Sequence, residues 1–465
     1  MASKPVAEFA ARTAIGPFGS RMKSDLYTDS GVPVIRGTNL TGGKVLSGDW
    51  VYVSDKTADD LSNCCVYPGD LVFPHRGAIG EVGIVPDQFP RYVMSSSMMT
   101  LSCDRSKARP DYVYYFFKSA AGRHELLKNA SQVGTPGIGQ PLSTLRAIEV
   151  PLPPPSSQFV IAKTLGDLDS KIDLNRRINQ TLEAMAQAIF KSWFVDFAPV
   201  KAKIAAKASR RDPLRAAMSV ISGKAAAELD ALPPEQREQL AATAALFPDE
   251  MEESEVGEVP KGWSVGTLSN FASFQNGYAF KTKDWTDSGH PVVKIGNVKP
   301  GIIDLSGCSL VAHETVNGLD RFALKKGDLL VGMTGYVGET GLVPALYSVA
   351  YLNQRVGRIS TVNGVSDIGY PFCLVRDPAY KAYAESKAHG SAQANVSGKD
   401  LMDYQAVVPD AGVLKIFNAQ VAKIINALLS YHEENQSLAA LRDTLLPRLL
   451  SGELLVADAM AEAVA

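Results

Sequence analysis

Side chains that can hydrogen-bond to the edges of nucleobases recur at matching places in two halves of the chain. Arg36 stands three residues before Asn39, and Lys294 stands three residues before Asn297. Arginine and asparagine are suited to bidentate contacts with guanine and adenine, respectively. A solvated turn or a polar contact that stabilises the fold would use the same residues, and the sequence leaves both interpretations open.

A second group of candidates lies in glycine-flanked turns and polar loops. His75 and Arg76 occupy one turn, and Met333 and Thr334 occupy the counterpart 258 residues later. Divergence at an otherwise matched turn is typical of a specificity loop, whereas the flanking glycines are better explained by turn geometry. The remaining candidate DNA-contacting residues are Gln140, Thr334, Tyr336, Gln354, Arg355, Gln393 and Asn395.

These candidates lie in an internal repeat. The segment YTDSGVPVIRGTNL (27–40) returns as WTDSGHPVVKIGNV (285–298), and residues 66–86 return as 324–344. One offset of 258 residues relates all these segments and also aligns Gly19 with Gly277. A register that holds for about 84 residues without a gap indicates two copies of one structural unit.

The elements that must position the candidates are strands and helices, so the predicted fold class is α+β. Short apolar runs between Gly, Asp and Pro turns predict β-rich copies, with a helix at 110–130 and its match at 371–390. After each copy, apolar residues step by three or four over a long segment, which predicts a long helix. Polar Asn residues on both apolar stripes favour an antiparallel coiled-coil spacer made of these two helices. The alternative, that each helix covers its own domain, stays open.

The predicted domain organisation follows from these patterns. The first β-rich domain covers 1–155, spacer helix 156–200 follows, and a linker or insertion covers 201–258. The second β-rich domain covers 259–410, the second spacer helix 411–454, and a C-terminal tail 455–465. The basic run from Lys201 to Arg211 is interpreted as a solvated linker, with a phosphate-contacting arm as the alternative.

Composition and missing motifs exclude several classes of function. There is no GxxxxGK[ST] loop, no [ND]PP[YF] motif, no HExxH motif and no CxxC pair among the five cysteines. We therefore expect no catalytic residue, no metal site and no cofactor on this chain. No stretch approaches the roughly 20 apolar residues of a membrane span, so a cytoplasmic protein without a membrane partner is expected. The net charge of −2 argues weakly against nucleic-acid binding by the whole surface.

Three further segments resemble those of a known protein family: FKSWFVDFAPVKAK (190–203), VPKGW (259–263) and LLPRLLSGEL (445–454). With GDLLVGMTGYVGETG (327–341) and LNQRV (352–356), and in this order, they resemble the specificity subunit of type I restriction-modification systems. The first copy departs from the pattern because it has no counterpart of Trp263, so we expect an altered opening strand and leave its N-terminal boundary open.

The resemblance implies a target-recognition domain in each copy and a bipartite, asymmetric double-stranded DNA target. It also implies two modification (methyltransferase) subunits and restriction (translocase/endonuclease) subunits as partners, with S-adenosylmethionine, ATP and Mg bound by those partners. Trp193, Phe194 and Phe197 are the candidate partner-binding residues, although packing within the spacer would also explain them. A protein-interaction scaffold with two β-rich binding domains is the alternative function.

Overall fold

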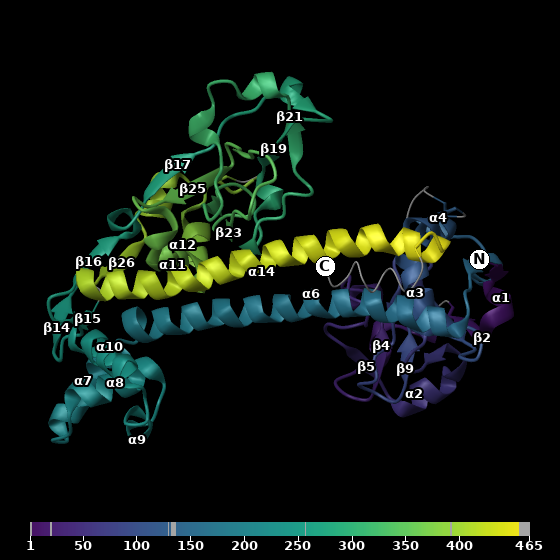
Figure 1. Cartoon of the computed structure of the whole chain (residues 1–465), viewed down its shortest axis with the longest axis horizontal. Helices are drawn as coiled ribbons and strands as arrows, with labels where there is room; N and C mark the ends of the chain where they lie inside the picture. Colours follow the sequence, from purple (N-terminus) through teal and green to yellow (C-terminus); the bar gives the residue numbers. More distant parts are fainter. Residues whose placement is uncertain are drawn as a thin grey trace. The chain divides into compact units, whose positions relative to one another are not determined.

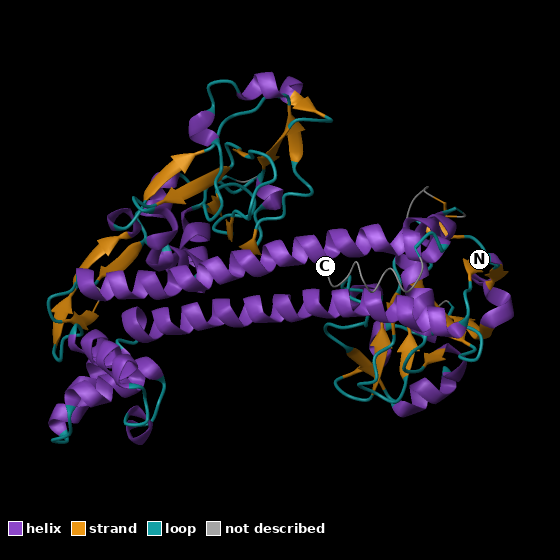
Figure 2. Ribbon diagram, viewed as in Figure 1, coloured by secondary structure: helices purple, strands orange, loops and turns teal. Residues whose placement is uncertain are grey.

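The computed structural model describes residues 2–18, 21–128, 130–131, 136–255, 257–390 and 393–454 and divides them into two units. The first unit contains the chain up to Asp173 and the part from Gln436 onward, and the second contains Leu174–Asn435. Each unit has one β-rich domain and one half of each of two long helices, α6 (Pro155–Phe190) and α14 (Ala411–Ser451) (Figure 1). Figure 2 shows strands and helices mixed within the domains, as the predicted α+β class requires.

The first domain is built on two sheets and two strand pairs, β1 with β13 and β11 with β12. Strand order β2-β10-β7-β8 forms one sheet, and β3-β5-β4-β9-β6 forms the other. The strand bounds are β1 Ser3–Pro5, β2 Ala10–Ile15, β3 Tyr27–Thr28, β4 Val32–Ile35, β5 Val51–Val53, β6 Cys65–Val66, β7 Leu71–Pro74, β8 Gly83–Ile84, β9 Tyr92–Met94, β10 Met98–Cys103, β11 Ala130–Ser131, β12 Gly137–Ile138 and β13 Glu149–Pro151. The helices are α1 Val6–Phe9, α2 Asp55–Asp60, α3 Pro110–Lys118, α4 Ala120–Leu127 and α5 Pro141–Ala147.

The second domain repeats this architecture. Its sheets have the orders β17-β25-β22-β23-β20 and β18-β21-β19-β24. The strand bounds are β16 Ser264–Thr267, β17 Ser273–Asn276, β18 Trp285–Thr286, β19 His290–Val293, β20 Gly301–Ile302, β21 Ser309–Val311, β22 Leu329–Gly332, β23 Thr340–Leu342, β24 Tyr351–Leu352, β25 Val356–Ser360 and β26 Gln405–Val408. The helices are α11 Gly369–Arg376, α12 Pro378–Lys387 and α13 Gly398–Met402.

Strand register follows the predicted offset of 258 residues. Val34 pairs with Val51 and Val93 in the first domain, and Val292 pairs with Ser309 and Tyr351 in the second. The single helices predicted at 110–130 and 371–390 are each two helices in the structure. The first break lies at Ser119, whose hydroxyl caps α4 by accepting from the Gly122 amide. Serine favours such cap positions because its oxygen satisfies an amide that has no helical partner.

The repeat register needs one correction near its start. Gly19 lies outside the described residues, and Gly16 is the structural counterpart of Gly277. A Cβ on Gly16 would lie 1.9 Å from the Ser95 carbonyl oxygen, and one on Gly277 would lie 2.1 Å from the matching Asn353 oxygen. The first copy also has an opening strand, because β1 pairs with β13 as β16 pairs with β26. Between this glycine and the matched segment that begins at Tyr27 or Trp285, the first copy therefore has three more residues than the second.

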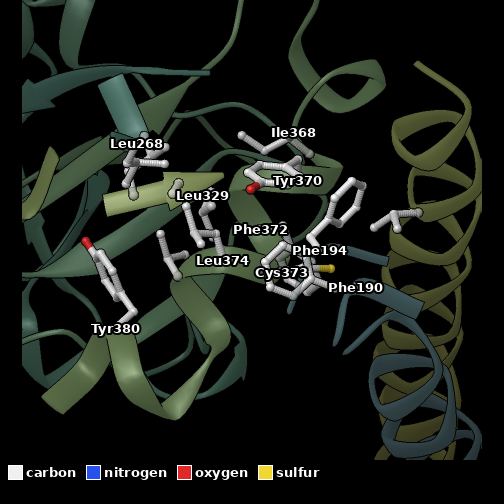
Figure 3. Packing of buried hydrophobic residues seen from close by; sticks show 14 of the residues in the cluster. Phe190, Phe194, Leu268, Leu329, Ile368, Tyr370, Phe372, Cys373, Leu374 and Tyr380 are labelled. Carbon is white, nitrogen blue, oxygen red and sulfur yellow. The ribbon is translucent and has the colours of Figure 1, made fainter. Parts of the chain in front are cut away.

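Each unit has its own apolar core, to which both long helices contribute. In the first unit, Ile161 and Leu165 of α6 join Leu445 and Leu449 of α14 and the domain's aromatic residues. In the second unit, the core includes Phe190 of α6 and residues of α14 and of the domain. Figure 3 shows Phe190 and Phe194 beside Tyr370 in this core. The sequence interpretation that each helix covers its own domain is therefore true of part of each helix.

The two helices also pair with each other, and within each unit they run antiparallel. In the first unit Arg442 donates to Asp169 at 2.8 Å. In the second, Asn175 donates to Glu434 at 2.8 Å and to Asn435 at 3.0 Å. Partner numbers fall along α14 as they rise along α6, because Asn179 donates to the Leu428 carbonyl. The predicted antiparallel spacer is confirmed, with asparagine side chains at its seam.

The first spacer helix differs from its predicted span of 156–200. α6 passes into a π-helical turn at Lys191–Val195, and Phe197 then takes a left-handed conformation (φ 52°) before α7 (Ala198–Ala208) begins. A left-handed φ is strained for a residue with a side chain, so it separates the two helices sharply.

The segment predicted as a linker or insertion, 201–258, is folded. It contains α7, α8 (Pro213–Ser222), α9 (Ala226–Leu229), α10 (Pro234–Ala245) and a hairpin of β14 (Met251–Ser254) with β15 (Gly257–Pro260). Met218, Leu229 and Ala244 form a small core within it. The basic run is not simply solvated, because Lys203 is buried and donates to the Phe247 carbonyl at 2.5 Å.

By length and composition alone, α14 could cross a membrane. Its apolar residues Val421, Ile425, Leu445 and Leu449 are buried in the cores of the two units. The need to fill two cores accounts for these apolar positions.

Candidate nucleic-acid interface

Three loops of the second domain meet through backbone hydrogen bonds. The Gly335 amide donates to the Ala394 carbonyl at 3.0 Å, and the Val396 amide donates to the Met333 carbonyl at 2.9 Å. The Met333 amide donates to the Arg355 carbonyl at 3.0 Å. We call residues 333–336, 354–355 and 393–397 the second platform. It joins most of the residues that the sequence nominated in this domain.

The first domain has the same arrangement at the same offset. The Gly77 amide donates to the Pro136 carbonyl at 3.0 Å, and the Ile138 amide donates to the His75 carbonyl at 3.0 Å. The His75 amide donates to the Ser97 carbonyl at 2.8 Å. Residues 75–78, 96–97 and 136–140 form the first platform. Each of these bonds has its counterpart in the second domain 258 residues later.

Glycines and an ion pair hold the first loop of each platform against a helix. Gly80 and Gly338 have positive φ, and a Cβ on Gly338 would lie 3.0 Å from the Ala384 Cβ of α12. Glu339 pairs with Lys381 of the same helix, and Glu81 pairs with Arg123 at 3.8 Å in the first domain. The interpretation of these glycines as turn geometry is consistent with this packing.

The side chains of the second platform are mostly exposed and polar. Thr334 is buried and donates to the Asn395 side chain at 2.6 Å, and Arg355 donates to the Gln393 side chain at 3.2 Å. Gln354, Gln393 and Asn395 are exposed. Tyr336 is 61% exposed and borders a cavity of about 290 Å³ that Glu339 and Glu385 also line. The surface thus offers amide, guanidinium and phenol groups within a small area.

The first platform carries fewer exposed polar side chains. Arg76 is exposed and has no side-chain hydrogen bond or ion pair with the described residues, and Gln140 is exposed where α5 begins. His75 is only 4% exposed, and its Nε2 donates to the Ser96 carbonyl at 3.1 Å. Burial lowers the pKa of His75, which favours the neutral ring. The His75 side chain, which the sequence predicts to contact DNA, is therefore buried in the platform and bound to a backbone carbonyl.

The Arg36–Asn39 and Lys294–Asn297 pairs form turns that follow strands bound next to the platforms, since the Ser95 amide donates to the Ile35 carbonyl and the Asn353 amide to the Val293 carbonyl. Asn39 is fully buried; its Oδ1 accepts from the Arg36 amide at 2.9 Å, and its Nδ2 donates to two backbone carbonyls. The side chain predicted to contact a base is therefore used within the turn, and no part of it is accessible. Asn297 accepts from the Lys294 amide in the same way and is partly exposed.

The two cations of these turns are held by neighbours. Arg36 is partly exposed and donates to the Asp49 carbonyl at 3.1 Å. Lys294 donates to Ser309 at 2.7 Å and lies 3.5 Å from the centre of the Trp285 ring. Burial lowers the pKa of Lys294. These contacts explain the two side chains as fold-stabilising groups.

The candidate partner-binding residues are core residues. Trp193, Phe194 and Phe197 are all buried in the second unit, where the Phe194 ring lies 4.9 Å from Tyr370 and 4.8 Å from Phe417 (Figure 3). The structure shows the alternative to partner binding, which is packing within the chain. In the second unit, the exposed apolar side chains of α6 and of the π-helical turn are Leu174, Met185 and Val195.

The sequence missed how the third loop of each platform aligns. Pro136 and Ala394 obey the same offset of 258 as the first loops, although their neighbourhoods share few residues. Extending the register beyond residue 102 would have found them. Among the described residues, no group of three or more His, Cys, Asp and Glu side chains could hold a metal ion.

Comparisons with known proteins assign the family. The type I restriction modification DNA specificity domain matches residues 16–184 and again residues 260–439. The HindI specificity subunit of Haemophilus influenzae is 29% identical over 435 residues, which cover 89% of this chain and 94% of that protein. The MjaIX specificity subunit of Methanocaldococcus jannaschii is 22% identical over 442 residues, covering 90% and 87% of the two chains.

The fold is also that of a solved specificity subunit. The crystal structure of the S subunit from M. genitalium superposes with a TM-score of 0.50 at 15% identity, covering 96% of this chain and 95% of that one. Since two copies of the family domain make up most of the sequence, the chain belongs to the type I restriction-modification specificity subunits, which are non-catalytic DNA-recognition components.

Proposed function

We propose that the chain binds a bipartite, asymmetric double-stranded DNA target, with each platform contacting one half. The observation that carries this proposal is one backbone frame used twice with unlike side chains. Arg76 and Ser97 of the first platform correspond to Thr334 and Arg355 of the second. Groups that differ at fixed backbone positions are suited to direct readout of different base edges.

The spacer helices support two separate readers on one chain. α6 has 36 residues and α14 has 41, which correspond to lengths of about 54 and 62 Å at 1.5 Å per residue. Such lengths exceed one turn of B-DNA, roughly 34 Å, which is the usual separation of half-sites. In this proposal the antiparallel pair fixes the gap between the two recognised sequences.

The proposal includes docking to two modification subunits and to restriction subunits, with the assembled complex working in the cytoplasm. The relatives are named as subunits of restriction enzymes, which supports such an assembly. Because the aromatic cluster is buried, the docking surface is assigned to exposed apolar side chains of the spacer, among them Leu174 and Met185. S-adenosylmethionine, ATP and Mg are assigned to the partners.

Methylome sequencing tests this function. The chain is expressed with its modification subunits in a host that lacks the system, and one bipartite adenine-methylation motif is expected. Exchanging residues 19–150 for another first domain should change one half of that motif and leave the other intact. A motif that changes in both halves, or duplex binding that is equal for target and random DNA at all salt concentrations, would refute the proposal.

A further inference from the structure

The platforms differ in where they carry their charge. Among their described residues, each platform contains one arginine and no other charged side chain. Arg76 lies on the first loop of its platform, whereas Arg355 lies on the second loop of its own. The positions that correspond to these arginines hold Thr334 and Ser97. The two platforms therefore carry their arginine on different loops, although the backbone hydrogen bonds between the loops are the same.

A single arginine among neutral polar groups suits base recognition better than phosphate binding. Surfaces that bind the DNA backbone gather several Lys and Arg side chains, because affinity grows with the number of phosphates neutralised. Arginine that reads a base acts alone, through two parallel N–H bonds to guanine O6 and N7. The chain as a whole has a net charge of −2, so general attraction to DNA is weak.

Each arginine is available for such a contact. Arg76 is exposed, and its backbone forms a bridge with Gly137, which fixes where the side chain begins. Arg355 is exposed and uses Nη1 to donate to the Gln393 side chain at 3.2 Å. A guanidinium has five N–H donors, so this one bond leaves a pair free for a base. Gln393 thus limits the directions in which Arg355 can point.

We propose that each half-site contains one G·C pair read by the platform arginine, by Arg76 in the first domain and by Arg355 in the second. Because the arginines start from different loops of one frame, the two guanines occupy non-equivalent positions relative to their domains. Gln393 is a positioning residue for Arg355. This inference rests on the proposed function, in which the platforms face DNA.

The test is the methylation motif of the complex with its modification subunits. Arg76→Ala should make one guanine of one half degenerate, and Arg355→Ala should do so in the other half. Loss of a bidentate pair predicts a fall in selectivity of about 5- to 150-fold at that base pair. Arg211→Ala, an exposed arginine of the helical insertion, is the matched control and should leave the motif unchanged.

A second measurement covers variants whose methylation is lost altogether. Purified complexes are tested against duplexes with 7-deazaguanine, which lacks the N7 acceptor, at the assigned position. The modified base should weaken binding by the wild type and not by the matching alanine variant. Gln393→Ala should reduce selectivity at the guanine read by Arg355, and Gln393→Glu, which still accepts from Arg355, should restore it.

The outcomes separate this inference from the proposed function. A bipartite motif that stays unchanged in both arginine variants overturns the guanine assignment alone. The same holds for loss of selectivity at an A·T pair, or for equal weakening on all sequences, which indicates a phosphate contact. A wild-type complex without any bipartite motif removes the proposed function as well.

Discussion

Phe194→Ala distinguishes a core residue from a partner-docking residue. Phe194 is 3% exposed, and its ring contacts those of Tyr370, Phe417 and Trp263. Replacing a buried phenylalanine by alanine usually costs about 3–5 kcal/mol, because transfer free energy is lost and a cavity remains. We expect the second unit to lose about this much free energy of unfolding, and partner binding by the folded fraction to be retained.

Urea unfolding of the full chain, followed by tryptophan fluorescence, measures the effect. With a slope of roughly 3 kcal/mol per M, the midpoint of the transition of the second unit should fall by about 1–1.7 M. Val195→Ala is the matched control: this side chain follows directly in the same π-helical turn but is 49% exposed, so its effect should stay within about 0.5 kcal/mol. A Phe194→Ala protein with the wild-type midpoint but no affinity for the methyltransferase subunits would refute the reasoning.

Three further predictions concern the frame and the seam. Gly16→Ala should destabilise the first unit by about 1–3 kcal/mol, because a Cβ at this position has no space. Gly37→Ala is the control and should leave the stability unchanged, since a Cβ on Gly37 would have no other atom within 4 Å. The midpoints of urea unfolding compare the two variants. Asn175→Ala should cost about 1–3 kcal/mol through lost hydrogen bonds in the helix seam, measured by the same titration; an unchanged midpoint would contradict this. Because burial lowers the pKa of His75 below its unfolded value of 6.5, the stability that it contributes is full above about pH 6.5 and is lost as pH falls towards the folded-state pKa. Melting temperatures at pH 7.5 and 5.5 should therefore differ less in His75→Gln than in the wild type, whereas exposed His124→Gln should behave as the wild type.

The repeat made much of the fold predictable from the sequence. Strand pairs such as Val34 with Val51 and Val292 with Ser309 share one register, because a slip by one residue would turn every buried side chain outward. The start of the copies was less predictable. Gly16 and Gly277 are equivalent because a carbonyl group occupies the space of a side chain at both, and a sequence offset cannot show such a contact.

The sequence predicted which loops carry the candidate site residues, but it did not predict which of their side chains are exposed. Arg-x-x-Asn has the spacing of a base-reading pair, but it is also the spacing of an asparagine that accepts from the backbone amide three residues earlier. Asp70 and Asp328 make the same contact with Tyr67 and Lys325, so the pattern recurs as turn chemistry throughout both domains. The burial of His75 could not be predicted either, because the glycine-flanked sequence around it is typical of an exposed turn.

The aromatic run at 193–197 shows a second limit of the sequence. Apolar side chains with helical spacing indicate burial, yet the burying surface can belong to the same chain or to a partner. Here the surface belongs to the second unit of the same chain, because Tyr370 of α11 and Phe417 of α14 pack against Phe194. Long-range contacts of this kind depend on the tertiary fold, which spacing alone does not determine.

The two copies separate stability from recognition within one loop system. Backbone hydrogen bonds hold the frame of each platform, and none of these bonds requires the exposed side chains to be of a given type. Arg76, Tyr336 and Arg355 can therefore change with little cost to folding, since surface substitutions seldom shift stability by more than about 0.5 kcal/mol. A frame of this kind lets a pair of domains keep the same fold while their exposed side chains diverge, which is what the proposed asymmetric target requires.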